Sequence, residues 1–229
     1  MLYFAYCVMK LSVQNLNIGK SFKLFSLACI FASSVITASA AQSETAYSAY
    51  MSGNYSRAVE LYTAQIDINK EYAPIYYGRG LAQARLNNTQ AAIDDFSAAL
   101  KLDDKHADSY YARALAFAKL GNYDSASDDI EKAISIFGRN ATYYYAAGTI
   151  YYHKENDDKS IECYSKALEI DPGYALAYYG RAVSYRFKEE NDEASRDFAK
   201  FLEMNPTGND IFVDEAKRMI DAIKTEKEQ

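Results

Sequence analysis

Apolar and polar residues recur along this chain with a period of 34 residues. Four similar segments begin at Ala73, Ala107, Ala141 and Ala175, and each carries adjacent tyrosines at its fourth and fifth positions. Extended towards the amino terminus, the same frame gives five consecutive units without insertion or deletion: 39–72, 73–106, 107–140, 141–174 and 175–208. A fixed period of this length is typical of repeat proteins, in which each unit packs against its neighbours.

Within each unit, the apolar positions have the spacing of helices. The eighth and twentieth positions are always small, the twenty-fourth is bulky and the twenty-eighth is aliphatic; in unit two these are Gly80, Ala92, Phe96 and Leu100. Residues four apart lie on one face of a helix. The pattern therefore predicts two amphipathic helices per unit, with small residues where their backbones approach each other.

The segment 209–229 does not continue the period. Its apolar residues form one stripe on an otherwise charged helix: Phe212, Ala216, Met219, Ile220 and Ile223. The last unit of a solenoid exposes an apolar face that needs a cover. We therefore expect this segment to form a capping helix.

The repeat resembles the tetratricopeptide repeat. Gly53-Asn54-Tyr55 and Gly121-Asn122-Tyr123 are similar to the turn between the two helices of that family, and Pro172 and Pro206 match its proline after the second helix. The resemblance covers residues 39–208. It implies an all-α fold in which five helix-turn-helix repeats form a right-handed superhelical solenoid, with the first helices along the concave side. Gln42 departs from the pattern at the fourth position. Because the first helix of this repeat is predicted to begin at Ala40, where the leader described next ends, we expect the first repeat to be frayed and partly a cap.

Residues 1–40 have a different character from the repeats. They contain three lysines and no acidic residue, followed by an apolar run over 24–37 that ends at Ala38-Ser39-Ala40. These are the parts of a secretory signal peptide, which predicts a mature repeat array over 41–208 in the periplasm or outside the cell. A retained membrane anchor and an acylated Cys29 are the alternatives, although a span needs roughly 20 apolar residues.

Charge and composition limit the possible functions. The chain has 25 basic and 31 acidic residues and a net charge of -6, which argues against a nucleic-acid partner. Three cysteines and two histidines provide little material for a metal site, and no glycine-rich phosphate loop is present. We interpret His106 and His153 as solvent-facing or groove histidines, and we expect no enzymatic activity and no cofactor.

The twenty-third position of the units is mostly acidic. It holds Leu61, Asp95, Asp129, Cys163 and Asp197. We interpret this position as part of a solvated outer face, which predicts exposed aspartates in the Asp94-Asp95 and Asp128-Asp129 pairs and a free surface thiol at Cys163. Arg79, Arg113 and Arg181, at the seventh position, are interpreted as structural residues between helices.

The fifth position is the candidate binding position. It carries Tyr77, Tyr111, Tyr145 and Tyr179 in four consecutive units. The fifth, ninth and twelfth positions lie beside the core stripe, and the resemblance places them towards the concave side. Because neighbouring packed helices run about 8–10 Å apart, the tyrosines would follow the groove as a ladder. Simple packing of the rings is the other interpretation.

Basic side chains at the twelfth and thirteenth positions belong to the same predicted face. They are Arg85, Lys119, His153 and Arg186. Together with the tyrosines they predict a basic groove for a partner segment that carries acidic and aromatic residues. The carboxylate clamp of chaperone-binding family members needs lysine at the fifth and asparagine at the ninth position, so that activity is not implied.

Two functions are consistent with these features. The first is a non-enzymatic scaffold of the bacterial cell envelope that binds another protein. The second is a glycan- or peptidoglycan-associated module, because tyrosine rings stack on sugars. In both, the only membrane contact would come from an uncleaved leader.

Overall fold

The computed structural model describes residues 44–205 and 211–228, and the predicted leader and its cleavage site lie outside these ranges. The described residues form helices and no strand. The helices are α3 (Ala46–Met51), α4 (Tyr55–Ile68), α5 (Ala73–Arg85), α6 (Thr89–Leu102), α7 (Ala107–Lys119), α8 (Tyr123–Ile136), α9 (Ala141–His153), α10 (Asp157–Ile170), α11 (Ala175–Phe187), α12 (Asn191–Met204) and α13 (Ile211–Lys227). None of them is long and apolar enough to cross a membrane.

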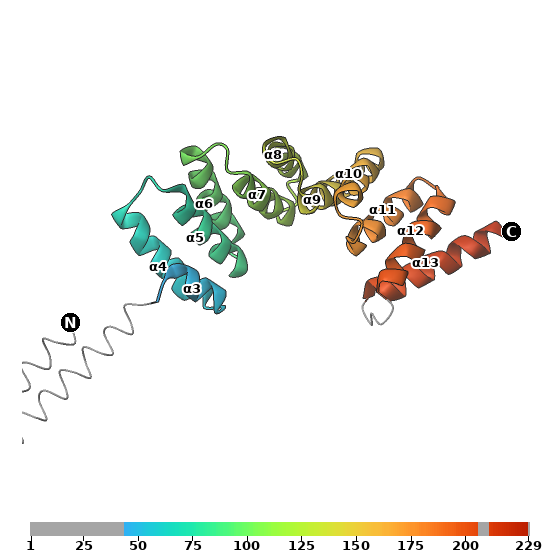
Figure 1. The fold of residues 1–229 in the computed structure, drawn as a ribbon, viewed down its shortest axis with the longest axis horizontal. Helices are drawn as coiled ribbons and strands as arrows, with labels where there is room; N and C mark the ends of the chain where they lie inside the picture. Colours follow the sequence, from blue (N-terminus) through green and yellow to red (C-terminus); the bar gives the residue numbers. More distant parts are fainter. Residues whose placement is uncertain (1–43, 206–210, 229) are drawn as a thin grey trace, which may run out of the picture.

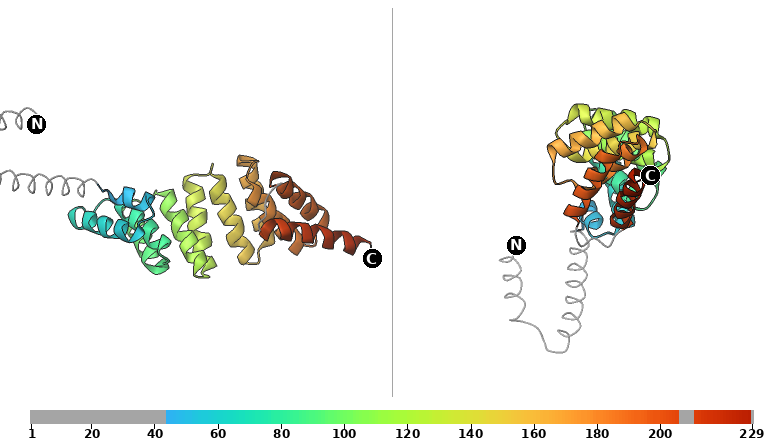
Figure 2. Two further views of the ribbon diagram at one scale, coloured as in Figure 1. Left: turned by 90° about the horizontal axis from the view of Figure 1, so that it is seen from below. Right: turned by 90° about the vertical axis from the view of Figure 1, so that its right-hand side faces the viewer.

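The helices form an arch of antiparallel pairs (Figure 1). Each first helix packs against the second helix of its own unit, and from α5 onwards also against the second helix of the preceding unit. In Figure 1, α7 and α9 lie towards the inner side of the arch, whereas α8 and α10 lie on its outer side. Seen from below, the pairs follow one another in chain order along the long axis (Figure 2). The predicted all-α solenoid of helix-turn-helix units is therefore confirmed.

The turn within each unit requires one residue with a left-handed backbone. The fifteenth positions, Gly53, Asn87, Gly121, Glu155 and Glu189, all have φ between 56° and 81°. This conformation is strained for residues with a Cβ atom and relaxed for glycine. The two Gly-Asn turns noted in the sequence supply the glycine, and the asparagine that follows caps the next helix.

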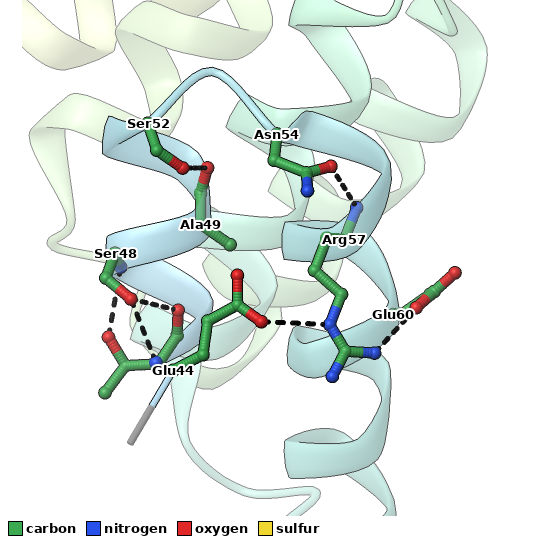
Figure 3. A network of polar contacts seen from close by, with 8 residues as sticks. Glu44, Ser48, Ala49, Ser52, Asn54, Arg57 and Glu60 are labelled. Carbon is green, nitrogen blue, oxygen red and sulfur yellow. Dashed lines mark hydrogen bonds and ion pairs between the residues drawn. The ribbon is translucent and has the colours of Figure 1, made fainter. Parts of the chain in front are cut away.

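A network of polar contacts stabilises the start of unit one (Figure 3). Thr45 and Ser48 form a capping box at α3, in which each side-chain oxygen accepts the other residue's backbone N–H at 3.0 Å. Arg57 of α4 donates to Glu44 at 3.2 Å and to Glu60 at 2.9 Å. This network ties the short helix α3 to α4, while Gln42 lies outside the described residues.

Small residues allow the close approach of helices, as predicted. A Cβ atom on Gly80 would lie 2.6 Å from the Phe96 ring, and one on Gly148 would lie 2.7 Å from the Tyr164 ring. The alanines at the eighth and twentieth positions of unit three, Ala114 and Ala126, are fully buried.

The three aspartates of the twenty-third position are buried and Leu61 and Cys163 are half-buried, so the prediction of a solvated face there is wrong. Asp95, Asp129 and Asp197 are at most 7% exposed, while Asp94 and Asp128 are exposed. Each buried aspartate accepts hydrogen bonds from the seventh-position arginine of the same unit, at 2.6–3.1 Å. The repeat pattern contains the arginine sixteen residues earlier in the same units, but residue positions alone do not show that the two side chains meet in the packed helices.

Each of these arginines also reaches the preceding unit. Arg79 donates to the hydroxyl of Thr63, Arg113 to Ser97 and Arg181 to Ser165, at 2.9–3.1 Å. We call this set of three residues the arginine clamp. It consists of the arginine at the seventh position, the aspartate at the twenty-third position of the same unit, and the hydroxyl residue at the twenty-fifth position of the preceding unit. It joins three helices, which confirms the structural interpretation of the arginines.

Cys163 occupies the aspartate position of unit four and is half-buried rather than a surface thiol. Burial raises the pKa of its thiol to about 12. A thiol with such a pKa is neutral at physiological pH and a poor nucleophile.

Helix α13 covers the apolar end of unit five. Val213, Ala216 and Ile223 are buried in one cluster with Phe198 and Phe201 of α12. In the predicted stripe, Met219 and Ile220 are half-buried and Phe212 is 41% exposed. Pro206 and Asn209 lie outside the described residues.

Candidate functional site

Each fifth-position tyrosine is half-buried and has at least one aromatic neighbour. Three of them pack against the bulky twenty-fourth residue of the second helix in the same unit. The ring centroids are 5.9 Å apart for Tyr77 and Phe96, 5.7 Å for Tyr145 and Tyr164, and 5.7 Å for Tyr179 and Phe198.

The tyrosine rings also contact the junction to the next unit. His106 and Tyr174 share the last position of their units, and their ring centroids lie 4.9 Å from those of Tyr77 and Tyr145. Tyr111 instead stacks on Tyr143 of unit four at 5.0 Å. These contacts assign a packing role to the tyrosines, and His106 additionally caps α7 by accepting the Ser109 backbone N–H at 3.1 Å.

Two clefts open between consecutive first helices. The α3–α5 cleft has a volume of about 370 Å³ and includes Tyr47, Tyr77 and Leu81. The α7–α9 cleft has a volume of about 200 Å³ and includes Tyr111, Leu115, Thr142, Tyr145 and Tyr174. Both use the second, fifth, sixth, ninth and twelfth positions of the first helices. They differ in the other lining residues, since the α3–α5 cleft includes Tyr62 and Gln65 of α4 and Tyr72 before α5, whereas the α7–α9 cleft includes Tyr174 before α11. The two clefts therefore lie on the same face of the first helices.

Exposed apolar side chains mark these clefts. Tyr47 is 64% exposed and Leu115 is 42% exposed, although both lie beside half-buried rings. The sequence pattern predicts the ninth position as part of the groove but does not single out these two residues. Their ninth-position spacing was the signal that could have identified them.

The basic residues are placed differently from the tyrosines. Arg85 and Lys119 are exposed in the last turns of α5 and α7, where the Lys119 Nζ atom donates to Asn87 at 2.7 Å. Arg186 forms an ion pair with Glu226 of α13 and donates to Asn191 at 2.7 Å. Neither of the two clefts is lined by these three side chains.

His153 is the one member of the basic set that lines a cleft with the tyrosines. It lies at the edge of the α7–α9 cleft and stacks on Tyr123, with the ring centroids 5.0 Å apart. It also lines a neighbouring hollow of about 400 Å³ with Tyr152, Glu155, Asp157 and Phe187. The surface here is aromatic with acidic groups at its edge.

Burial raises the pKa of the ladder tyrosines further above physiological pH. It raises the pKa of Tyr77 to about 12 and also raises the pKa values of Tyr111 and Tyr145. The hydroxyl groups are therefore neutral at physiological pH and can act as hydrogen-bond donors. In the described ranges, no group of three or more His, Cys, Asp or Glu side chains is arranged to hold a metal ion.

The fold and these clefts define a helical repeat solenoid with a series of binding positions along its first helices. Models of the tetratricopeptide repeat match residues 43–107, 107–140 and 175–207, and a further model of the TPR repeat matches residues 148–186. The chain belongs to the tetratricopeptide repeat family.

Solved structures of other proteins in this class have the same fold. MamA is 25% identical with a TM-score of 0.68, and the match covers 71% of this chain and 95% of MamA. YrrB, described as a TPR protein with an unusual peptide-binding site, is 22% identical with a TM-score of 0.66, covering 76% of this chain and 88% of YrrB. MamA from Desulfovibrio magneticus RS-1 is 23% identical with a TM-score of 0.68, covering 72% and 93%. No curated protein matches the sequence.

Proposed function

We propose that this protein is a non-enzymatic scaffold that binds a segment of a partner protein in the clefts between its first helices. The observation that carries the proposal is the recurrence of the α3–α5 and α7–α9 clefts at the same repeat positions. A partner segment that lies along the first helices would meet both clefts in turn. Binding of peptides by a solenoid of the same fold, YrrB, supports this function.

The clefts favour apolar or aromatic side chains in the partner. Tyr47 and Leu115 offer exposed apolar area, and the half-buried tyrosines have little rotational freedom left to lose on binding. Arg85 and Lys119 are exposed at the ends of the same helices, so acidic residues that flank the apolar ones would be attracted there. Charge at this distance contributes to the association rate more than to the affinity.

Binding of glycans has less support than binding of protein. A sugar would stack on a free ring face, whereas Tyr111 and Tyr145 already stack on Tyr143 and Tyr174. We place the scaffold in the cell envelope on the basis of the predicted signal peptide over residues 1–40. Mass spectrometry of the exported protein tests that location, because a mature amino terminus at Ala41 is expected.

Site-specific photocross-linking in cells tests the binding face. A photoreactive residue at Leu115, in the α7–α9 cleft, should form a discrete adduct with a partner protein. The matched control is Ile136 at the end of α8, which is 38% exposed and lines none of the clefts. A partner isolated in this way should bind the Leu115→Gln variant at least tenfold more weakly than the Ile136→Gln variant, a difference typical of a contact at a binding hot spot. Equal cross-linking or equal binding at the two positions would contradict the proposed face.

A further inference from the structure

The arginine clamp of unit three surrounds a guanidinium with both acceptors and aromatic rings. Arg113 donates to the two carboxylate oxygens of Asp129 at 2.7 and 2.8 Å and to the Ser97 hydroxyl at 2.9 Å. Its guanidinium carbon lies 5.7 Å from the ring centroid of Tyr110 and 5.8 Å from that of Phe117. Unit five repeats this arrangement around Arg181.

Unit four lacks the clamp but retains its aromatic rings. Ala147 stands at the arginine position, Cys163 at the aspartate position, and Glu131 at the position of the preceding hydroxyl. Tyr144 and Tyr151 keep the fourth and eleventh positions that hold the two rings in unit three. Unit four therefore has a small side chain where units three and five have arginine, and it still has the two aromatic rings that contact the arginine in those units.

The structure has a cleft of about 290 Å³ at this place, between α8, α9 and α10. We call it the Ala147 cleft. It is lined by Glu131, Ile134, Ser135, Tyr144, Ala147, Tyr151, Lys159, Glu162 and Cys163. Its positions differ from those of the clefts between first helices, so it is a separate site.

The charges around the Ala147 cleft favour a cation. Glu131 from α8 and Glu162 from α10 supply two carboxylates, and Lys159 supplies one ammonium group. Tyr151 donates its hydroxyl hydrogen to Glu131. Cys163 adds no negative charge, because its thiol is neutral. The carboxylate of Glu131 is therefore held at the cleft and keeps lone pairs for a further donor.

Lys159 is a cation beside this cleft, but its ion pair with Glu131 is long and exposed to solvent. Its Nζ atom donates to the Tyr151 hydroxyl at 3.3 Å and lies 3.6 Å from a Glu131 oxygen and 4.7 Å from the Tyr151 ring centroid, and its side chain is 52% exposed. Ion pairs of exposed lysines are weak and easily replaced. An ammonium group also lacks the flat face by which a guanidinium stacks on aromatic rings.

We propose that the Ala147 cleft binds the guanidinium group of an arginine side chain supplied by a partner protein. The guanidinium would lie against Tyr144 and Tyr151 and donate to Glu131. A guanidinium group from another chain would then take the place that the guanidinium groups of Arg79, Arg113 and Arg181 have within their own units. The proposal does not depend on the clefts between the first helices.

Titration with a minimal arginine probe tests this site directly. The probe is Nα-acetyl-arginine amide, and the matched control is Nα-acetyl-citrulline amide, which has the same shape and no charge. Backbone amide signals of Tyr144, Ala147 and Tyr151 should shift and saturate with the arginine probe, and the citrulline probe should bind at least tenfold more weakly. Signals of Tyr178 and Arg181, where the clamp is complete, should not move. Absence of saturation up to about 20 mM, far above the millimolar dissociation constant expected of so small a ligand, would overturn the proposal.

Two variants distinguish the Ala147 cleft from nonspecific attraction. Glu131→Gln keeps the shape of an exposed side chain and removes its charge, so it should fold normally and lose at least tenfold in probe affinity. The triple variant Ala147→Arg, Cys163→Asp and Glu131→Ser rebuilds the clamp within unit four, so it should show no saturable shifts at Tyr144 and Tyr151. Unchanged probe binding by the folded Glu131→Gln variant would overturn the proposal even if the triple variant failed to fold.

Discussion

Units four and five have the same length and the same aromatic residues around their seventh positions, yet their interiors are stabilised differently. Unit five uses the ion pair between Arg181 and Asp197, whose Nε–Oδ2 distance is 2.6 Å. Unit four has no such pair and instead buries Ser160, which donates to the Gly148 carbonyl oxygen at 2.9 Å and lies 2.8 Å from the Ser184 hydroxyl. The comparison shows that the solenoid requires small residues at helix contacts, whereas the polar clamp can be replaced.

The largest expected effect comes from breaking the clamp of unit five. Arg181→Ala leaves Asp197 buried without its cation, which should cost about 3–5 kcal/mol of unfolding free energy. The double variant Arg181→Ala with Asp197→Cys copies unit four, and it should recover about half of that loss because the orphaned charge is gone. Urea denaturation followed by circular dichroism measures both values. Equal losses in the two variants would show that the charge is not the cause.

A smaller effect is expected where unit four differs from unit five at the eighth position. Gly148→Ala places a Cβ atom 2.7 Å from the Tyr164 ring, so overpacking should cost about 1–3 kcal/mol. Unit five tolerates Ala182 at the same position against Phe198. The double variant Gly148→Ala with Tyr164→Ile copies the pair found in unit three and should lose less than the sum of the single losses. Strict additivity in denaturation experiments would exclude this contact as the cause.

The smallest effect concerns the hydroxyl pair. Ser160→Ala copies Ala194 of unit five and removes two hydrogen bonds from a buried site, at a cost of about 1–2 kcal/mol. A double-mutant cycle with Ser184→Ala should give a coupling of about 0.5–1.5 kcal/mol, since the two groups share one hydrogen bond. A coupling near zero would indicate that the two hydroxyl groups do not interact in solution.

The candidate site was only partly accessible from the sequence. The period predicts a ladder of Tyr77, Tyr111, Tyr145 and Tyr179 beside the core stripe; the first three line clefts, whereas Tyr179 lines neither of the two clefts between first helices. The predicted basic groove differs from the structure, because Arg85 and Lys119 lie in the last turns of their helices and line neither of the two clefts. Long side chains reach several positions from one backbone site, so a pattern of positions does not place their charges.

The sequence alone determined the repeat length, the two helices of each unit and the small residues between them. These follow from local periodicity, since residues four apart share a helix face whatever the rest of the chain does. Tertiary structure alone decided that the aspartates of the twenty-third position are buried and that unit four contains a cleft. The burial of each aspartate depends on an arginine sixteen residues earlier, which also binds a hydroxyl group of the preceding unit. The cleft lies where unit four has other residues at these three positions. A buried charge is stable only when such partners surround it, and their convergence is a property of the packed helices.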